Sequence, residues 1–455
     1  MATPAASLHR VSERYFVGAS GLDDDGLRLA LAPALTPDGV DDRPAFFRGT
    51  VAHPQVLARA LVTLADITST RYFQYAATPP SDPVVTASGD RLRFECFSAC
   101  HGVYARLDVL REGLGGGTVA YGTTNVDLGT GIRTALSTLG RSDLLPLALG
   151  TDDDRPQPAG RAVEMPHRWV TAPGNAAELQ LDLEEAFTVP AAGARAFLAA
   201  LPAATGSARA SWLSASRGTV RLGARRTPGA VNVAGLHRLS ALKRMLTHAT
   251  GLSVHATQAD QGPTAVVLHL LGARLTLGLT DELWRTHSAQ GALRAALVVP
   301  GVVEHAEAVA MQLGFESALD VAALAAGAGI DAADVRAALP VLASAGRVGW
   351  DLTDRAFFHR ELPDDPDRVD RSNPRLVAAR GLVAADAVEG HPEPDAWLVR
   401  STRAPGQQYL VRHRDGWRCT CAWYLRHGTS RGPCKHALAV ALATGAVTDV
   451  GDTEG

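Results

Sequence analysis

The sequence predicts an α+β protein of several domains, with repeated strand-helix-strand-strand units, a helical segment followed by a hairpin, and a small C-terminal ββα unit. Three observations predict this class. The length of 455 residues corresponds to about three domains. Apolar residues recur with helical spacing in some stretches and with strand spacing in others. The apolar content of 46% and the charged content of 20% are typical of a globular protein.

The first strand-helix-strand-strand unit is expected within residues 44–110. A short apolar strand at Phe46–Val51 precedes a helix at His53–Ile67, whose apolar residues have the spacing of one helix face. Arg71–Tyr75 is rich in aromatic residues and is expected to be a strand. Arg91–Leu110 then alternates apolar and polar residues, which predicts strands with one apolar and one polar face.

A related order of elements recurs in the second part of the chain. Its strand, helix, strand and final strand pair are expected at Ala230–Val233, Leu236–Thr250, Leu252–His255 and Ala265–Leu279. A third, weaker copy begins near Glu185 and includes Ala191–Leu201, Trp212 and Val220–Leu222. Repetition of this kind indicates internal duplication. The order strand-helix-strand-strand is also seen in clamp-like scaffolds.

Residues 319–361 have the order helix, turn, helix and two-stranded wing, which is the order of a winged helix-turn-helix. Asp331 is expected to cap the second helix. The two helices and the two wing strands are expected at Val321–Gly327, Val335–Ser344, Arg347–Asp351 and Ala356–Arg360. The second helix of such a module reads DNA, but here it offers one basic side chain, Arg336, after two acidic ones. A structural or protein-docking role is therefore favoured over DNA reading.

Two pairs of metal-ligating residues lie near the C-terminus. Cys419 and Cys421 form one pair, Cys434 and His436 form the other, and twelve residues separate the pairs. Residues i and i+2 of a strand project to the same face, and four such ligands suit a tetrahedral Zn²⁺. Four protein ligands leave no position for water, which favours structural over catalytic zinc. Buried free thiols, and His427 in place of His436, are the alternatives.

Local signals around these pairs predict a ββα arrangement. Short strands are expected at Trp397–Arg400 and Tyr409–Arg412, and the dipeptide Asp415-Gly416 is a strong hairpin signal. The hairpin returns the chain into Trp417–Cys421, and an apolar helix follows at Ala437–Ala443. Cys434 is thus expected near a helix N-terminus, where the helix dipole favours a thiolate.

The pattern C-x-C, an intervening loop and C-x-H resembles the SWIM zinc finger, with Cys419, Cys421, Cys434 and His436 at its four ligand positions. The resemblance implies an element that holds Zn²⁺ and binds DNA or a protein partner. Cys100–Asp108 and Gly122–Asp127 are also similar to bacterial, especially actinobacterial, SWIM-containing proteins. Such proteins are often encoded beside MoxR-type AAA ATPases and von Willebrand A proteins, so the resemblance implies these as candidate partners.

Positive charge is concentrated around the predicted zinc ligands. Eight basic residues and one acidic residue lie from Arg400 to Lys435, so this stretch carries +7, whereas the whole chain carries −3 and the remainder −10. With the aromatic residues between them, these side chains suit phosphate contact and base stacking. The candidate nucleic-acid contacts are Arg412, Arg414, Arg418, Arg426, Arg431 and Lys435. Alternatively the basic residues neutralise the thiolates and the aromatic residues fill a small core, so DNA and protein both remain open as the ligand.

No sequence motif identifies an active site, and the protein is expected not to be an enzyme. The chain has two lysines, and neither follows a glycine, which excludes a P-loop. The alternative is an enzyme with an unrecognised site in the first 300 residues and the zinc finger as a targeting module. Cys96, Cys100 and His101 could form a second metal site, although a buried free cysteine is common.

Composition also bears on location and domain organisation. No apolar run approaches the roughly 20 residues that cross a bilayer, and Met1–Ser20 has no apolar signal region. Five cysteines in so long a chain indicate reduced thiols, so a cytoplasmic protein is expected. The expected divisions are an α+β domain at 1–165, a second at 166–305, a winged-helix-like segment at 306–362, a linker at 363–374, the zinc finger at 375–449 and a tail at 450–455.

Overall fold

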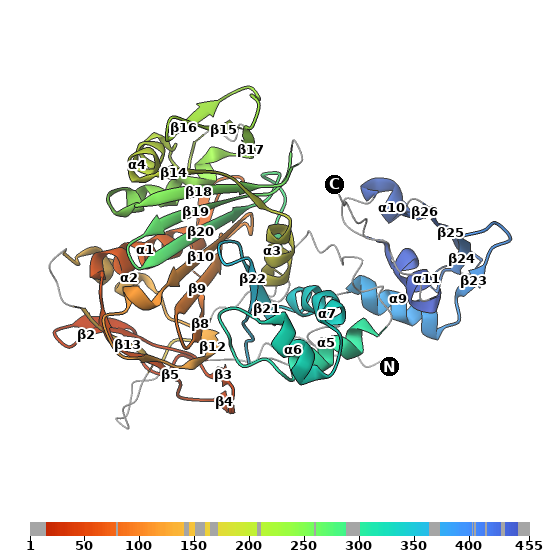
Figure 1. The fold of residues 1–455 in the computed structure, drawn as a ribbon, viewed down its shortest axis with the longest axis horizontal. Coiled ribbons are helices and arrows are strands. Elements are labelled where there is room, and N and C mark those ends of the chain that lie inside the picture. The colour runs from red at the N-terminus through yellow and green to blue at the C-terminus, as the bar shows by residue number, and fades with distance from the viewer. Residues whose placement is uncertain are drawn as a thin grey trace, which may run out of the picture.

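The computed structural model describes residues 15–78, 81–140, 145–150, 160–163, 172–206, 211–258, 261–287, 301–363, 374–402, 404, 406–414, 416–428 and 433–444. Figure 1 shows a large mixed α/β body, a group of helices at its side, and a small C-terminal unit beyond those helices. The C-terminal tail at 450–455 and nearly all of the expected linker lie outside the described residues. None of the helices in the described ranges combines the length and apolar character that crossing a membrane requires.

A ten-stranded antiparallel sheet forms the centre of the body (Figure 1). It is continuous because β10 pairs with β20 over seven residues, from Val103 opposite Leu279 to Val109 opposite Ala273. The first and second expected units therefore share one sheet. In spatial order its strands are β14 (Glu184–Pro190), β18 (Gly251–Ala256), β19 (Thr264–Leu270), β20 (Ala273–Leu279), β10 (Val103–Val109), β9 (Leu92–Phe97), β8 (Val84–Ser88), β12 (Tyr121–Asn125), β3 (Ala34–Thr36) and β4 (Gly39–Asp41).

The remaining strands of the body form smaller sheets. A five-stranded sheet consists of β1 (Gly21–Asp23), β2 (Gly26–Leu29), β13 (Leu145–Gly150), β5 (Ala45–Val51) and β11 (Thr118–Val119). A three-stranded sheet consists of β16 (Thr219–Gly223), β15 (Ser211–Ser216) and β17 (Val231–Val233). The opening strands of the first two expected units, β5 and β17, thus pair outside the central sheet.

Helices cover the apolar face of the central sheet. The helix α1 (Pro54–Thr68) agrees closely with its prediction and is almost wholly buried, packing against η3 (Leu236–His248) and β10. The expected helix at Leu236–Thr250 is a 3₁₀-helix rather than an α-helix. The helices α4 (Ala191–Ala200) and α2 (Thr130–Ser137) complete this layer.

The expected aromatic strand at Arg71–Tyr75 is wrong. This stretch forms a turn between two short strands, β6 (Thr70–Arg71) and β7 (Ala76–Ala77). Tyr72 is buried and its ring lies 6.2 Å from that of His237, so its aromatic character serves packing against η3 rather than strand pairing.

The helical group at the side of the body consists of α3 (Ala172–Leu181), α5 (Val302–Ala310), α6 (Val321–Ala328) and α7 (Ala332–Ser344). A hairpin follows, with strands β21 (Val348–Asp351) and β22 (Ala356–His359). Asp331 occupies the N-cap position of α7 but accepts no capping hydrogen bond through its side chain. Asp320 does cap α6, because its carboxylate accepts hydrogen bonds from two backbone amides of the first turn.

The C-terminal unit is a four-stranded antiparallel sheet with helices. Its strands are β23 (Val388–Gly390), β24 (Ala396–Arg400), β25 (Gln408–His413) and β26 (Trp417–Cys419). Its helices are α9 (Pro374–Ala384), α10 (Ala422–His427) and α11 (Lys435–Thr444), and α9 packs against α11. The sequence predicted β24 to β26 and α11 but not α9, β23 or α10.

Candidate metal centre

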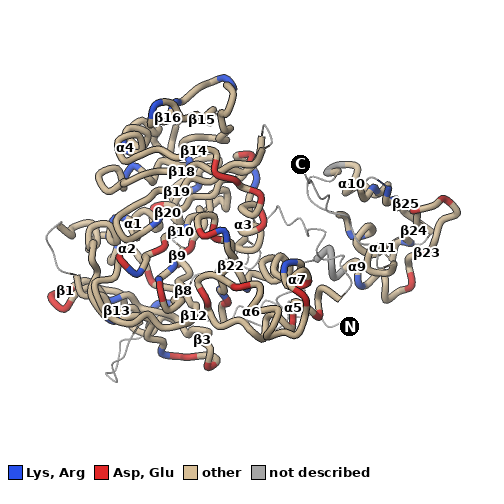
Figure 2. Tube along the Cα trace, in the orientation of Figure 1, with Lys and Arg blue, Asp and Glu red and all other residues tan. Residues whose placement is uncertain are grey.

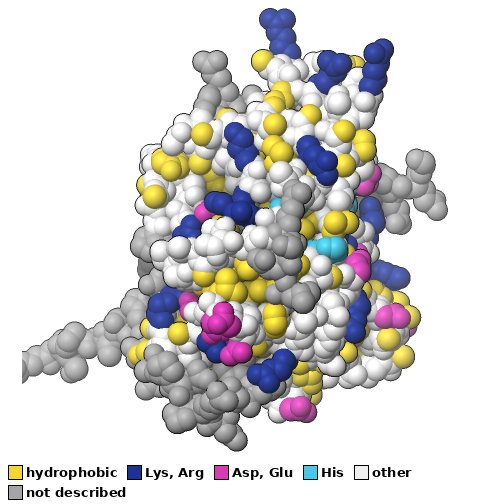
Figure 3. Space-filling model, turned by 90° about the vertical axis from the view of Figure 1, so that its left-hand side faces the viewer, with side chains coloured by type: hydrophobic (Ala, Val, Ile, Leu, Met, Phe, Trp, Pro, Cys, Tyr) yellow, Lys and Arg dark blue, Asp and Glu magenta, His cyan; other side chains and the backbone are white. Residues whose placement is uncertain are grey.

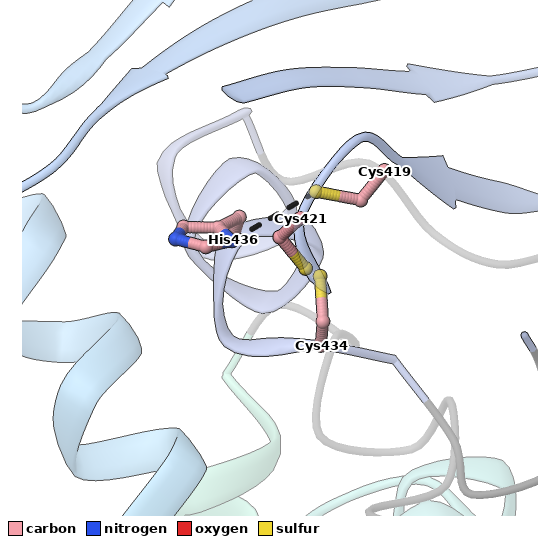
Figure 4. Close-up of side chains that lie close together, drawn as sticks. All are labelled: Cys419, Cys421, Cys434 and His436. Carbon is pink, nitrogen blue, oxygen red and sulfur yellow. Dashed lines mark hydrogen bonds between the residues drawn. The ribbon is translucent and has the colours of Figure 1, made fainter. Parts of the chain in front are cut away.

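The four predicted ligands come from three element ends that meet in space (Figure 4). Cys419 is the last residue of β26, and Cys421 is the N-cap of α10, where its sulfur accepts a hydrogen bond from the Tyr424 amide. Cys434 immediately precedes α11, and His436 lies in the first turn of that helix. The Cys434 sulfur also accepts from a helical amide, that of Ala437, at 3.5 Å. Two helix N-termini therefore direct partial positive charge at the sulfurs.

The ligand atoms have the spacing of a zinc site. One ligand atom from each residue lies within 4.8 Å of all the others, and all four residues are buried. The Cys419 sulfur is 3.8 Å from Nδ1 of His436 (Figure 4). Zinc bond lengths of about 2.0–2.3 Å place tetrahedral ligands about 3.3–3.8 Å apart. The residues present therefore fit Zn²⁺ and would close its coordination with protein ligands alone.

The three thiols lie close enough to shift one another's pKa. Hydrogen bonds from Cys419 and then from Cys434 hold the pKa of the Cys421 thiol far below its ordinary value. The hydrogen bond with Cys421 in turn raises the pKa of Cys419. Three buried sulfurs thus compete for protons, and a bound Zn²⁺ removes this competition because it deprotonates coordinating thiols outright.

Aromatic rings build the surroundings of the site. The Tyr409 ring stacks on the His436 imidazole with centroids 4.2 Å apart, and the His413 ring stacks on Trp417 at the same distance. Trp417 is buried and lies near Trp397. Trp417 belongs to the buried core of the unit, and Trp397 and Tyr409 pack against that core while partly exposed.

The six candidate nucleic-acid contacts differ in their surroundings: some are paired, some are exposed or half-buried, and some lie outside the described residues. Arg412 and Arg414 both pair with Glu393, with Nη2–carboxylate distances of 2.9 and 3.3 Å. The hydrogen bond from Arg412 lowers the pKa of Glu393. Arg418 is exposed on β26 and Lys435 is half-buried at the start of α11. Arg431 lies outside the described residues. The side chains of Arg426 and of the alternative ligand His427 also lie outside them.

Glu393 was missed because it precedes the stretch in which the charges were counted. It lies in the β23–β24 loop, three residues before Ala396, which pairs with Arg412 across the sheet. A count extended over the whole hairpin could have found it.

A second metal site at Cys96, Cys100 and His101 is not supported. Cys96 is fully buried, burial raises the pKa of its thiol, and its sulfur contacts the Leu64 carbonyl at 3.7 Å. Cys100 contacts the Ser98 hydroxyl at 3.5 Å. Among the residues that the structure describes, the group around Cys419 is the one whose potential ligand atoms come together.

Comparison with known proteins identifies the C-terminal unit. Residues 409–445 match the SWIM zinc finger, a stretch that contains all four ligands. The chain therefore contains a SWIM zinc finger that binds Zn²⁺. A comparison with curated proteins found no match.

Two solved structures are similar to about half of the chain. Proliferating cellular nuclear antigen from Entamoeba histolytica has a TM-score of 0.33 and 12% identity, covering 52% of this chain and 99% of its own. The PCNA2–PCNA3 complex from Sulfolobus tokodaii has a TM-score of 0.36 and 12% identity, covering 51% and 98%.

Proposed function

We propose that this protein is a non-enzymatic, zinc-binding adaptor whose SWIM finger recognises DNA. The observation that carries the proposal is the placement of basic residues directly beside the zinc ligands. Arg418 precedes Cys419 in the chain, and Lys435 lies between Cys434 and His436. Zinc joins the end of β26 to the start of α11, so the metal also fixes the relative positions of these two cations.

Charge distribution supports phosphate as the ligand. The stretch from Arg400 to Lys435 carries +7 in a chain of −3, and such an excess favours a polyanion. On the face of the molecule turned away from the finger, basic and acidic side chains are scattered among neutral ones (Figure 3). Since most aromatic rings of the finger pack inward, contact with the phosphate backbone is expected to outweigh base stacking.

The test is a mobility-shift titration of the full chain with duplex DNA at several salt concentrations. Reversing Arg418 to Glu is expected to weaken binding about tenfold and to reduce the salt slope by about one. Arg221→Glu, on the exposed strand β16, is the matched control and should bind like the wild type. Binding that is indifferent to Arg418→Glu would count against DNA recognition by the finger.

A protein partner is the second candidate, and two observations favour it. Glu393 already neutralises part of the charge of Arg412 and Arg414. Leu425 on α10 is 76% exposed and offers an apolar side chain for contact with a protein. The resemblance to bacterial SWIM-containing proteins supplies MoxR-type AAA ATPases and von Willebrand A proteins as candidates. Pull-down from native cells with Leu425→Asp as the control would identify a partner held through α10.

In this proposal the remaining parts have supporting roles in a cytoplasmic bacterial protein. The repeated strand-helix-strand-strand units of the body are the scaffold. Residues 306–362 are a winged-helix-like segment, which the order α6, α7, β21 and β22 supports. The absence of a recognised catalytic motif supports an adaptor over an enzyme.

A further inference from the structure

The central sheet has a polar face that is buried. Arg93 and Glu95 on β9 lie opposite Asp108 and Arg106 on β10, and Asp108 lies opposite Arg274 on β20. In a strand with one polar face these side chains would meet solvent, yet Arg93, Arg106 and Asp108 are completely buried. In Figure 2 basic and acidic positions gather around β9, β10 and β22. The alternation expected from the sequence is present, but a second layer covers the polar side.

The β21–β22 hairpin, hereafter the wing, provides the covering layer through one carboxylate. Asp351 at the end of β21 is fully buried. Its oxygens lie 2.7 Å from Nη2 of Arg93, 3.0 Å from Nη2 of Arg106 and 3.1 Å from Nη2 of Arg274. Asp108 holds the other side of the first two guanidinium groups, at 2.6 and 3.0 Å from Nε. A single wing carboxylate thus completes a cage of three arginines.

The rest of the wing fits the sheet equally closely. The Arg93 guanidinium lies 3.7 Å above the Phe358 ring. Phe358 in turn covers Gly349, where an added Cβ would lie 2.3 Å from the ring. Arg360 pairs with Glu95, and Tyr104 donates a hydrogen bond to the same carboxylate oxygen at 2.6 Å. Both ends of the wing are therefore held by charged contacts with the sheet.

The second helix of the winged-helix-like segment, α7, also packs against another part of the protein. The C-terminal half of α7 is buried, and α3 packs against it. A Cβ added to Gly174 on α3 would lie 2.3 Å from the carbonyl oxygen of Ala343 in α7, so the two backbones touch. What α7 leaves exposed includes one basic side chain, that of Arg336. The wing and the C-terminal half of the second helix are thus used inside the protein, and the exposed N-terminal half carries Asp334 beside Arg336.

We infer that the winged-helix-like segment is an internal docking module, and that its wing is the ligand of the arginine cage on the central sheet. It does not read DNA. Buried ion pairs contribute little net stability compared with apolar contacts, and the role inferred for them here is to select one arrangement. Their effect is to fix the segment in a single register on the sheet. This assignment goes beyond the adaptor function and does not depend on what the finger binds.

Hydrogen exchange on the full chain tests the docking. Asp354 at the rim of the contact pairs with Arg274 at 2.7 Å and with Arg91, and it is partly exposed, so Asp354→Asn should still fold. Arg360→Gln breaks the contact with Glu95 at the other end. Each variant is expected to accelerate amide exchange in Val348–Asp351 and Ala356–His359 by about tenfold while β18 and β19 stay protected. Asp24→Asn, in the exposed turn between β1 and β2, is the matched control.

Wing amides that exchange as slowly in both variants as in the control would overturn the docking role. The second claim, that the segment does not read DNA, is tested by Arg336→Glu. This variant should leave the affinity of the full chain for duplex DNA within about twofold of the wild type. An equal loss in Arg336→Glu and Arg418→Glu, or a gain of affinity in Asp354→Asn, would show that the segment reads DNA. If the wild-type chain binds no DNA, the proposed function fails, whereas the exchange experiment still decides the docking.

Discussion

Replacing Asp351 by Asn is expected to destabilise the body severely, although the two side chains have nearly the same shape. The change removes one negative charge that three guanidinium groups share in a site without solvent. Removing one partner of a buried ion pair costs about 3–5 kcal/mol, because the remaining charge stays buried without compensation. Asn keeps one acceptor oxygen, which places the expected loss near the lower end, about 3 kcal/mol. Domain stabilities are about 5–15 kcal/mol, so this is a large fraction of the total.

Urea denaturation monitored by circular dichroism measures this loss of unfolding free energy, with Asp24→Asn as the control. The pH dependence supplies a second readout. Burial alone would raise the pKa of Asp351, but Arg106, Arg93 and Arg274 outweigh it and hold the pKa far below the ordinary value. A carboxyl group with a lowered folded-state pKa contributes stability that is present above its unfolded pKa of about 3.9 and is lost as the pH falls further. The gap between wild type and Asp351→Asn should therefore be widest near neutral pH and shrink below about pH 4.

Two results would refute this reasoning. A difference in unfolding free energy below about 1 kcal/mol at neutral pH would mean that the cage tolerates a neutral ligand. A difference that stays constant from neutral pH to pH 3 would mean that the charge of Asp351 is not what stabilises the contact.

Three further predictions concern the metal centre and the wing. Cys434→Ala should unfold the finger and leave the body folded, because zinc affinity is folding energy for so small a unit; a thermal melt without a selective loss of the finger would contradict this. Reductively purified protein should contain one Zn²⁺ per chain by elemental analysis, and a chelator should accelerate amide exchange in β24 to β26 and α11 alone, so a chain without stoichiometric divalent metal excludes the centre. Gly349→Ala should displace the Phe358 ring from beneath Arg93 and cost about 1–3 kcal/mol through overpacking, whereas Gly390→Ala, with nothing within 4 Å of the added Cβ, should be nearly neutral; equal unfolding midpoints for the two variants would rule out the close contact.

Local signals in the sequence were sufficient where the structure depends on near neighbours. The zinc ligands were predicted because two i, i+2 pairs and a hairpin turn fix them within 18 residues. The helix α1 and the strands β9 and β10 followed from periodicity alone.

The polar face of β9 could not be predicted as buried. Arg93 and Asp351 are separated by 258 positions, and no local pattern indicates that the hairpin with Asp351 covers the strand with Arg93. The same reason explains why β5 and β9, close in sequence, belong to different sheets: their partners, β13 and β10 among them, are chosen by long-range packing.

The arginines of this chain differ in whether the fold gives them a partner. At the contact between the sheet and the wing, Arg91, Arg93, Arg106, Arg274 and Arg360 are matched by the five carboxylates of Asp90, Asp108, Asp351, Asp354 and Glu95. A matched and buried network has no charge left to attract a ligand. From Arg400 to Lys435 the sequence has eight basic residues and one acidic residue, and Glu393, which precedes this stretch, pairs with Arg412 and Arg414. An external polyanion can therefore be attracted at the finger and not at the contact between the sheet and the wing. This is why charge reversal should weaken DNA binding at Arg418 and leave it nearly unchanged at Arg336 of the winged-helix-like segment.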